Sequence, residues 1–201
     1  MKLYYSPAAC SLAVHIALRE AGFPVNLVKV DLSTHTLEDG TDYFTTNPKG
    51  PVPLLELDNG DVISEVAVIL QYIADQVPGK KLAPVNGTMA RVRLQEALNF
   101  LATEIHKGSG LFFHSHAGDE LKVAYRKKLR GFYELIDRQL SATGWLIGDQ
   151  FTVADAYLFV MVNLSSFIQL DLNGLDAMAK FKSSMLSRPS VQTALKAEGL
   201  V

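Results

Sequence analysis

Cysteine is nearly absent from this chain, and so is any long uninterrupted apolar run. Cys10 is the single cysteine among 201 residues, which excludes an intramolecular disulfide and a cysteine-cluster zinc site. The residues after Met1 lack the apolar core of a signal peptide. The most apolar stretch, residues 156–170, is interrupted by polar side chains and is shorter than the ~20 residues of a membrane span. We therefore expect a cytoplasmic protein that does not enter a membrane.

An excess of charge of one sign is missing as well. The 19 Lys and Arg residues nearly balance the 21 Asp and Glu residues, which leaves a formal net charge of −2. Binding to a phosphate backbone needs clustered basic residues, so we expect no nucleic acid partner. Hydrophobic residues are plentiful, at 48% of the chain, which excludes a disordered tail and suffices for one or two buried cores.

Residues 1–82 change their hydrophobic period repeatedly, a pattern typical of strands and helices that alternate around a sheet. Asn59-Gly60 is a strong hairpin signal within it. A right-handed βαβ unit followed by a ββα unit gives a four-stranded mixed sheet in a thioredoxin-like arrangement. We expect strands at 2–5, 25–30, 53–57 and 62–63, and helices at 11–22, 38–46 and 65–76.

The segment 78–84 combines Pro and Gly with charge and has little to bury, which marks a domain boundary. The chain after it has a helical period throughout. The expected architecture is α/β plus all-α, with a thioredoxin-like domain in residues 1–80 and a helical bundle domain in residues 87–201. The expected helices of the second domain are 89–107, 120–140, 153–169, 175–186 and 190–197.

Cys10 follows the first predicted strand and immediately precedes the first helix. Unpaired backbone N–H groups and the helix dipole favour an anion there, so this thiol is a candidate for a lowered pKa. The alternative is a small buried hydrophobe, because unpaired cysteine is among the most buried residue types. The position favours the functional interpretation.

Two further positions in the first domain could bind a peptide-like ligand. A cis Val52-Pro53 bond would turn the N–H and C=O of Val52 outward for pairing with an extended peptide, although spacing alone favours a stiff loop with trans bonds. Glu65 opens a predicted helix, where an acid offsets the dipole without a ligand. A zwitterion site, in which Glu65 receives an ammonium group, is an equally open alternative.

A polar strip follows the predicted helix at residues 89–107. Gln95, Asn99, Thr103 and His106 recur at intervals of four, four and three, so an α-helix would bring them to one face. Such a strip could line a wet cleft. The spacing favours an ordinary solvated face on which His106 and Lys107 complement the helix C-terminus.

Thr152 and Asp155 form a Thr-x-x-Asp capping box ahead of an apolar helix. We assign both residues a structural role rather than a catalytic one, because capping accounts for them. The histidines at 15, 114 and 116 show no spacing that converges with other metal ligands. We expect no metal site.

Four motifs, in this order, resemble those of cytosolic glutathione transferases, most closely the bacterial beta class. They are MKLYYSPAACSL at 1–12, NPKGPVP at 47–53, EIHKG at 104–108 and FTVADAY at 151–157, so the resemblance covers essentially the whole chain. It implies an enzyme of detoxification that takes glutathione as a co-substrate and needs no metal. It also implies a cytoplasmic homodimer that acts on small hydrophobic electrophiles.

The resemblance implies roles for individual residues. Cys10 would lie beside the glutathione sulfur, where it would stabilise the thiolate or form a mixed disulfide. His106 would lie near the sulfur and the electrophile. Val52 would pair through its backbone with the cysteinyl part of the tripeptide, with Pro53 cis, and Glu65 would hold the γ-glutamyl ammonium. Asn99 and Thr103 would reach the glutathione of the other subunit. The further glutathione-binding residues implied are Tyr5, His35, Val66 and Lys107, and the electrophile pocket would contain Ala8, Phe112, Phe113 and Tyr157.

Two positions depart from the family pattern. Many relatives have a hydroxyl residue where this chain has Val66, so the Val66 backbone N–H would hold the γ-glutamyl carboxylate alone. Beta-class relatives often have lysine where this chain has His35. Recognition of the glycyl carboxylate would then be weaker or pH-dependent, because histidine titrates near neutrality.

The leading hypothesis is conjugation of the glutathione thiolate to an apolar electrophile over a cleft between the domains. A rival is a monothiol redox enzyme in which Cys10 exchanges disulfides with glutathione, since a cysteine can form a mixed disulfide and a hydroxyl residue cannot. A third hypothesis, from another class, is a non-catalytic protein that uses the fold to bind partners or apolar ligands.

Overall fold

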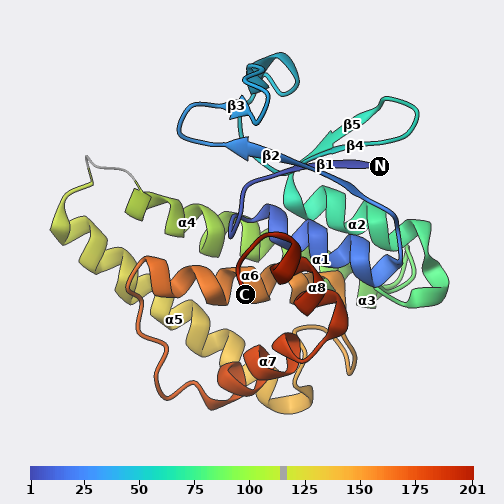
Figure 1. The fold of residues 1–201 in the computed structure, drawn as a ribbon. Helices are drawn as coiled ribbons and strands as arrows, with labels where there is room; N and C mark the ends of the chain where they lie inside the picture. Colours follow the sequence, from blue (N-terminus) through green and yellow to red (C-terminus); the bar gives the residue numbers. More distant parts are fainter. Residues whose placement is uncertain (114–116) are drawn as a thin grey trace. The chain divides into compact units, whose positions relative to one another are not determined.

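The computed structural model describes residues 1–113 and 117–201, which form two compact units. Unit 1 comprises Met1–Leu82 and Arg188–Val201, and unit 2 comprises Ala83–Ser187 (Figure 1). The sequence assigns everything after residue 87 to the helical domain. By its contacts, the last segment of the chain, Arg188–Val201, groups with unit 1.

Unit 1 is built on a mixed sheet of five strands in the order β3-β2-β1-β4-β5. The central strand β1 pairs in parallel with β2 and antiparallel with β4, and the edge strands β3 and β5 pair antiparallel with β2 and β4. The predicted thioredoxin-like arrangement is confirmed. The strand bounds are Lys2–Tyr5 (β1), Asn26–Asp31 (β2), Thr36–Leu37 (β3), Leu54–Glu56 (β4) and Val62–Ser64 (β5).

The prediction of four strands is wrong by one. The extra strand, β3, has only two residues, too few to show the alternation by which strands are recognised in a sequence. The helix expected over residues 38–46 is also wrong. Turns and the 3₁₀ helix Tyr43–Thr45 occupy that segment, and the Asp42 side chain caps this helix by accepting from the Phe44 N–H.

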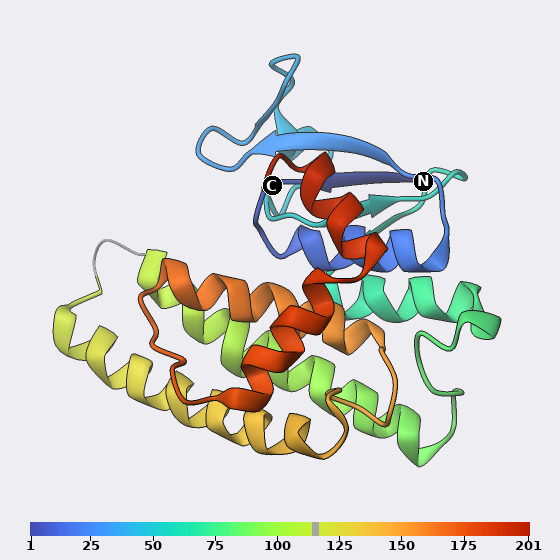
Figure 2. The same cartoon turned by 60° about the horizontal axis from the view of Figure 1, so that its bottom comes forward.

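Helices α1 and α2 lie side by side against one face of the sheet (Figures 1 and 2). Leu3 and Leu55, which lie opposite each other in the strand register, are fully buried. Helix α1 ends at Gly22, whose φ of +81° suits the left-handed cap that glycine favours. The bounds of the three α-helices of this unit are Ser11–Ala21 (α1), Val66–Gln76 (α2) and Pro189–Ala197 (α8), and a second 3₁₀ helix spans Pro78–Lys80.

A second core covers part of the other face of the sheet. Tyr43, from the loop after β3, is fully buried against the strand residues Tyr4, Val30 and Leu54 and against Val52. The cluster fixes the loop that carries Val52 to the sheet, so it positions a candidate site residue.

Two carboxylates attach the C-terminal segment to α1. Glu20 accepts hydrogen bonds from Arg188 Nε at 2.7 Å and from the Ser190 hydroxyl, at the start of α8. Just after α8, the buried Glu198 Oε1 lies 2.9 Å from Nδ1 of the buried His15. These long-range pairs explain why the segment belongs to unit 1.

Unit 2 is helical, as predicted. The helix expected over residues 89–107 is a longer run made of four parts: α3 and α4 enclose a π-helical segment, and a 3₁₀ turn follows. Central helix α6 is buried along most of its length, as its apolar sequence predicts. The bounds are Met89–Phe100 (α3), Leu101–His106 (π), Lys107–Gly110 (α4), Leu111–Phe113 (3₁₀), Asp119–Thr143 (α5), Val153–Phe167 (α6) and Asp176–Leu186 (α7).

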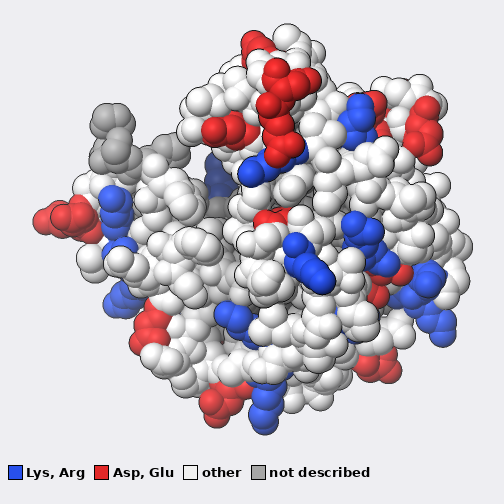
Figure 3. Space-filling view, in the orientation of Figure 1, with Lys and Arg blue, Asp and Glu red and all other residues white. Residues whose placement is uncertain are grey.

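Within the described residues, no helix is both long and apolar enough to cross a membrane. On the face drawn in Figure 3, acidic and basic side chains are interspersed. This distribution agrees with the small net charge of the sequence.

Candidate functional site

Cys10 is the N-cap residue of α1, as predicted. Its Sγ donates a hydrogen bond to the carbonyl oxygen of Val52 at 3.3 Å. Burial raises the pKa of the Cys10 thiol to about 12, and the negative charge of Glu65 adds to the effect. The backbone N–H groups of Cys10 and Ser11 act in the opposite direction but do not outweigh burial. The expected lowering of this pKa is therefore wrong, because desolvation destabilises the thiolate more than the N–H groups at the helix N-terminus stabilise it.

The loop before β4 carries Val52, which is 6% exposed and is joined to Pro53 by a cis bond. The trans bond favoured by spacing alone is wrong, whereas the family resemblance implied cis. Asn47 Nδ2 and the Tyr43 hydroxyl both donate to the Pro51 carbonyl, at 2.7 and 3.2 Å. No described residue accepts a hydrogen bond from the Val52 N–H. The two bonds to the Pro51 carbonyl thus fix the loop, while the Val52 N–H makes no hydrogen bond within the described part of the chain.

Glu65 is the N-cap residue of α2 rather than its first helical residue, and its φ is +72°. Its carbonyl accepts from the Ile69 N–H at 3.0 Å, and its side chain is 71% exposed. Lys49, which sequence reasoning did not single out, approaches within 3.9 Å of Glu65 Oε1 and donates to the Ser64 hydroxyl at 3.2 Å. Val66 is buried at the first turn of α2. An exposed carboxylate beside free helical N–H groups can bind the two ends of a zwitterion.

Three candidate site residues have a positive φ. Ala8, His35 and Glu65 have φ values of +62°, +55° and +72°, and they account for three of the five non-glycine residues in that region within the described chain. Each such conformation costs on the order of 1–3 kcal/mol, and such residues concentrate at binding and catalytic sites. No local feature of the sequence predicts them.

His35 is stacked on Phe44, with ring centroids 4.6 Å apart and an angle of 17° between the planes. Both rings lie over Gly50, where an added Cβ would come within 2.8 Å of Phe44 Cε1. Gly50 also has a φ of +86°, so glycine is required there on two counts. Tyr5, at the end of β1, is mostly buried, and this burial raises the pKa of its hydroxyl.

In unit 2, His106 and Tyr157 meet although they are 51 positions apart in the sequence. His106 Nδ1 lies 2.8 Å from the Tyr157 hydroxyl, and the rings pack edge to face with centroids 5.9 Å apart. His106 ends the π-helical segment, and Tyr157, on α6, is 1% exposed. A rigid tyrosine therefore orients a half-buried histidine.

The polar strip expected on one α-helical face is altered by the π-helical segment. Asn99 lies in α3 and Thr103 in the π-helix, where bonds from i to i+5 change the angular spacing of side chains. Both side chains are exposed, and the Thr103 hydroxyl donates to the Asn99 carbonyl at 3.0 Å. Lys107 is exposed as well.

The two candidate phenylalanines differ in their surroundings. The Arg126 guanidinium lies 4.9 Å from the centroid of the Phe112 ring, whereas Phe113 is 65% exposed. An exposed phenylalanine offers apolar surface to a ligand. Ala8 is partly buried in the turn that precedes Cys10.

The predicted capping box forms at the start of α6. The fully buried Asp155 accepts from the Thr152 N–H at 2.7 Å, from the Thr152 hydroxyl at 2.9 Å and from the Leu146 N–H at 2.8 Å. Its role is therefore wider than capping, because it also fixes the loop before the helix. Of the remaining histidines, His15 pairs with Glu198, and His114 and His116 lie outside the described residues.

No three or more His, Cys, Asp or Glu residues form a group that could hold a metal ion in the parts of the chain that the structure describes. The candidate groups are instead a thiol, backbone donors, a carboxylate and a histidine. These groups suit binding of a peptide and handling of a proton or a thiol.

Comparison with known proteins identifies the family. Residues 8–76 match the family described as glutathione S-transferase, N-terminal domain, and residues 104–198 match glutathione S-transferase, C-terminal domain. The chain is 46% identical to glutathione S-transferase GstA of Escherichia coli O157:H7 over 201 residues that cover the whole of both proteins.

Two solved structures cover the whole of this chain and are themselves covered completely. A sphingomonad glutathione S-transferase complexed with glutathione is 42% identical, with a TM-score of 0.95. The beta-class glutathione S-transferase of Sphingomonas chungbukensis is 44% identical, with a TM-score of 0.95. The chain therefore belongs to the glutathione S-transferase family, as its motifs predict, and its activity is that of a glutathione S-transferase.

Proposed function

We propose that the protein binds reduced glutathione through unit 1 and transfers its thiolate to small hydrophobic electrophiles. The observation that carries this proposal is the Cys10 thiol at the N-terminus of α1, hydrogen-bonded to the carbonyl of Val52. The glutathione held by the 42% identical sphingomonad structure supports it. Only a thiolate is a competent nucleophile, and lowering the pKa of a free thiol by about two units gives roughly 20-fold to 30-fold more thiolate at neutral pH.

Unit 1 offers one group for each part of the tripeptide. The unused N–H of Val52 pairs with the cysteinyl residue, and the exposed carboxylate of Glu65 receives the γ-glutamyl ammonium. The Val66 N–H, at the first turn of α2, receives the γ-glutamyl carboxylate. Tyr5 and His35 complete the proposed binding residues, with His35 facing the glycyl carboxylate.

Cys10 acts in this proposal as a hydrogen-bond donor that keeps its proton. A thiol with a pKa of about 12 is almost fully protonated at neutral pH, so it donates to Val52 O in the absence of ligand and to the glutathione sulfur in its presence. Disulfide exchange, in contrast, needs Cys10 itself as a thiolate. The raised pKa therefore favours conjugation over the redox alternative.

Unit 2 supplies the groups that face the electrophile in the proposal. We assign His106, which Tyr157 contacts, a role at the reacting sulfur. Phe112 and the exposed Phe113 of this unit, with Ala8 of unit 1, are the proposed apolar surface for the electrophile. The proposed assembly is a cytoplasmic homodimer that serves detoxification. Asn99 and Thr103 then act on the glutathione of the partner, and Lys107 is a further proposed glutathione-binding residue.

Replacing Cys10 with alanine separates the two chemistries. We expect Cys10→Ala to keep conjugation of an activated aryl chloride within about tenfold of the parent, since removal of one hydrogen bond costs about 0.5–1.5 kcal/mol. Disulfide reductase activity, if the parent has any, is expected to vanish. Loss of conjugation together with a strong parental reductase activity would reverse the assignment. If the parent shows neither activity and is not retained on immobilised glutathione, the result would favour a non-catalytic protein that uses the fold to bind other ligands or partners.

The contact between His106 and Tyr157 predicts a specific kinetic effect. In Tyr157→Phe the ring remains and only the hydroxyl that contacts Nδ1 at 2.8 Å is lost. We expect kcat/KM for an activated aryl chloride to fall about fivefold to tenfold, because one hydrogen bond no longer orients the imidazole. Initial rates measure the effect, and ¹⁵N NMR of His106 is expected to show an altered tautomer ratio.

Tyr133→Phe is the matched control. Tyr133 is equally buried in unit 2, and its hydroxyl donates to the Met161 carbonyl at 2.8 Å rather than to a candidate site residue. We expect a comparable loss of stability and an unchanged kcat/KM. If both variants lower kcat/KM equally, the effect is structural and His106 is not positioned by Tyr157.

A further inference from the structure

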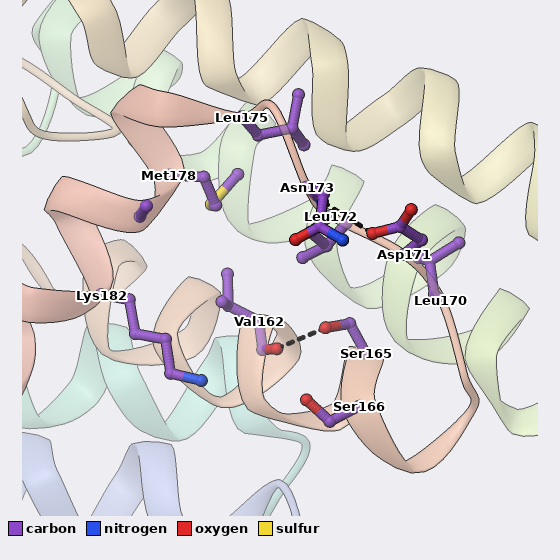
Figure 4. Close-up of a pocket in the computed structure, with 11 residues that line it drawn as sticks. Val162, Ser165, Ser166, Leu170, Asp171, Leu172, Asn173, Leu175, Met178 and Lys182 are labelled. Atoms are coloured by element: carbon purple, nitrogen blue, oxygen red, sulfur yellow. Dashed lines mark hydrogen bonds between the residues drawn. The ribbon is translucent and has the colours of Figure 1, made fainter.

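Unit 2 contains a pocket that none of the proposed glutathione or electrophile residues lines. It has a volume of about 280 Å³ and lies where the C-terminal end of α6, the following loop and α7 meet (Figure 4). A volume of this size holds a ligand of roughly ten heavy atoms. The residues that line it are Val162, Ser165, Ser166, Leu170, Asp171, Leu172, Asn173, Leu175, Met178, Ala179 and Lys182.

The pocket has an apolar floor. Val162, Leu170, Leu175 and Met178 all contribute to it, and each is less than 9% exposed. These side chains come from α6, the loop and α7, so three separate segments close around one apolar space. Such a floor binds the hydrocarbon part of a ligand without a specific hydrogen bond.

The loop that forms one wall is held in place from α5. Arg126 Nε donates to the Ile168 carbonyl at 3.0 Å, and Arg130 donates to the Asp171 and Asn173 carbonyls at 2.6 and 2.9 Å. Asp171 Oδ1 also accepts from the Asn173 N–H at 2.8 Å. The wall is therefore preorganised, which lowers the entropic cost of binding.

Lys182 is a half-buried cation at the edge of this space. It extends from α7 toward the end of α6 (Figure 4), and its ammonium makes no hydrogen bond or ion pair with any residue that the structure describes. The Ser166 hydroxyl and the Asn173 side-chain amide, also at the pocket, are unpartnered in the same sense. The Ser165 hydroxyl, in contrast, donates to the Val162 carbonyl at 2.7 Å. One cation, two neutral polar groups and one carboxylate thus border the apolar floor, and the carboxylate, that of Asp171, already accepts from the Asn173 N–H.

We propose that this pocket binds a small carboxylate with an aromatic or branched apolar body. The carboxylate pairs with Lys182 and accepts from Ser166 or Asn173, and the apolar body rests on Val162, Leu175 and Met178. The site is separate from the residues proposed for conjugation, so the two proposals stand or fall independently. A plain alternative exists, in which the Lys182 charge complements the carbonyl end of α6 and needs no ligand.

Phenylacetate is a suitable probe, and phenylacetamide is its uncharged counterpart of the same shape. We expect phenylacetate to cause saturable shifts of the backbone amide NMR signals of Met178 and Ala179 in the full-length protein, with glutathione present throughout. Phenylacetamide is expected to bind at least tenfold more weakly, because the charge-assisted hydrogen bond is lost. Equal binding of the two compounds, or no saturable shift of these signals, would overturn the proposal.

Variants of α7 identify the cation. Lys182→Met removes the charge and keeps the apolar stem, and we expect it to weaken phenylacetate binding about tenfold. Lys182→Arg is expected to restore binding to within threefold. Lys180→Met, at an exposed lysine of the same helix, is the matched control and is expected to change nothing. If Lys180→Met weakens binding as much as Lys182→Met, the effect is a general one of charge and the pocket is not a carboxylate site. Conjugation of an aryl chloride is expected to be unchanged in all three variants.

Discussion

Cys10 is expected to react with iodoacetamide at pH 7 about a hundred times more slowly than free glutathione does. A thiol with the ordinary pKa of about 8.5 is roughly 3% ionised at pH 7, whereas one with a pKa of about 12 is ionised to roughly one part in 10⁵. The resulting ~3,000-fold deficit in thiolate is partly offset, since the thiolate of a weaker acid is the stronger nucleophile, by roughly 40-fold over this range. The reaction of Cys10 is slower because burial disfavours the thiolate and so raises the pKa of the thiol.

The measurement is direct because the chain has a single cysteine. Mass spectrometry of the intact protein therefore counts alkylation of Cys10 alone. The rate is expected to keep rising with pH well above 8.5, where that of glutathione levels off. The same protein unfolded in urea is expected to react like a free thiol. A folded protein that reacts as fast as glutathione at pH 7 would contradict the account of a protonated Cys10.

Asp155→Ala is expected to destabilise the fold by about 3 kcal/mol. The fully buried carboxylate accepts hydrogen bonds from the Thr152 N–H, the Thr152 hydroxyl and the Leu146 N–H, and its removal leaves these donors without that acceptor. Each buried donor left unsatisfied costs about 1–3 kcal/mol. In a chain of this length 1 kcal/mol corresponds to about 2–4 °C, so Tm is expected to fall by roughly 6–12 °C in a thermal melt.

Asp31→Ala is the matched control for this experiment. The Asp31 carboxylate also accepts hydrogen bonds, from the Ser33 N–H at 2.8 Å and the Ser33 hydroxyl at 2.6 Å, but it is exposed to water. Water replaces both bonds after substitution, so Tm is expected to change by less than about 2 °C. Equal decreases in Tm for the two variants would mean that burial does not determine how much Asp155 contributes to stability.

The parts of the fold that depend on local chemistry could be predicted from the sequence. Gly22 ends α1 in the left-handed conformation, Asn59-Gly60 lies between β4 and β5, and Thr152 begins α6. In each case one or two residues determine the backbone conformation through a steric or hydrogen-bonding preference. These signals do not depend on the rest of the chain.

The features that the sequence did not reveal share a different cause, which is dependence on distant residues. The pKa of Cys10 is set by burial against a loop more than forty positions away, and no spacing near Cys10 encodes that burial. The C-terminal segment joins unit 1 through His15 and Glu198, a pair separated by 183 positions. The π-helical segment before His106 has no strong local signal either.

The candidate site was predictable in its composition but not in its geometry. The sequence motifs supplied Cys10, Val52 and Glu65, and the structure adds the positive φ of Glu65 and the bond from Cys10 to Val52. His106 and Tyr157 lie in two separate motifs, and the sequence does not predict that their side chains are in contact. Nothing in the local sequence singles out Lys49, because its approach to Glu65 joins a proline-rich loop to a helix start 16 positions away.

The central claim is that the bound glutathione thiol is more acidic than the free one. Titration of the protein–glutathione complex, followed by the ultraviolet absorbance of the thiolate, measures this pKa, and the Cys10→Ala variant checks that the signal comes from glutathione. We expect an apparent pKa about two units below that of free glutathione in the parent, with part of the shift lost in Cys10→Ala. A bound thiol that titrates at the same pH as free glutathione would contradict the proposed mechanism.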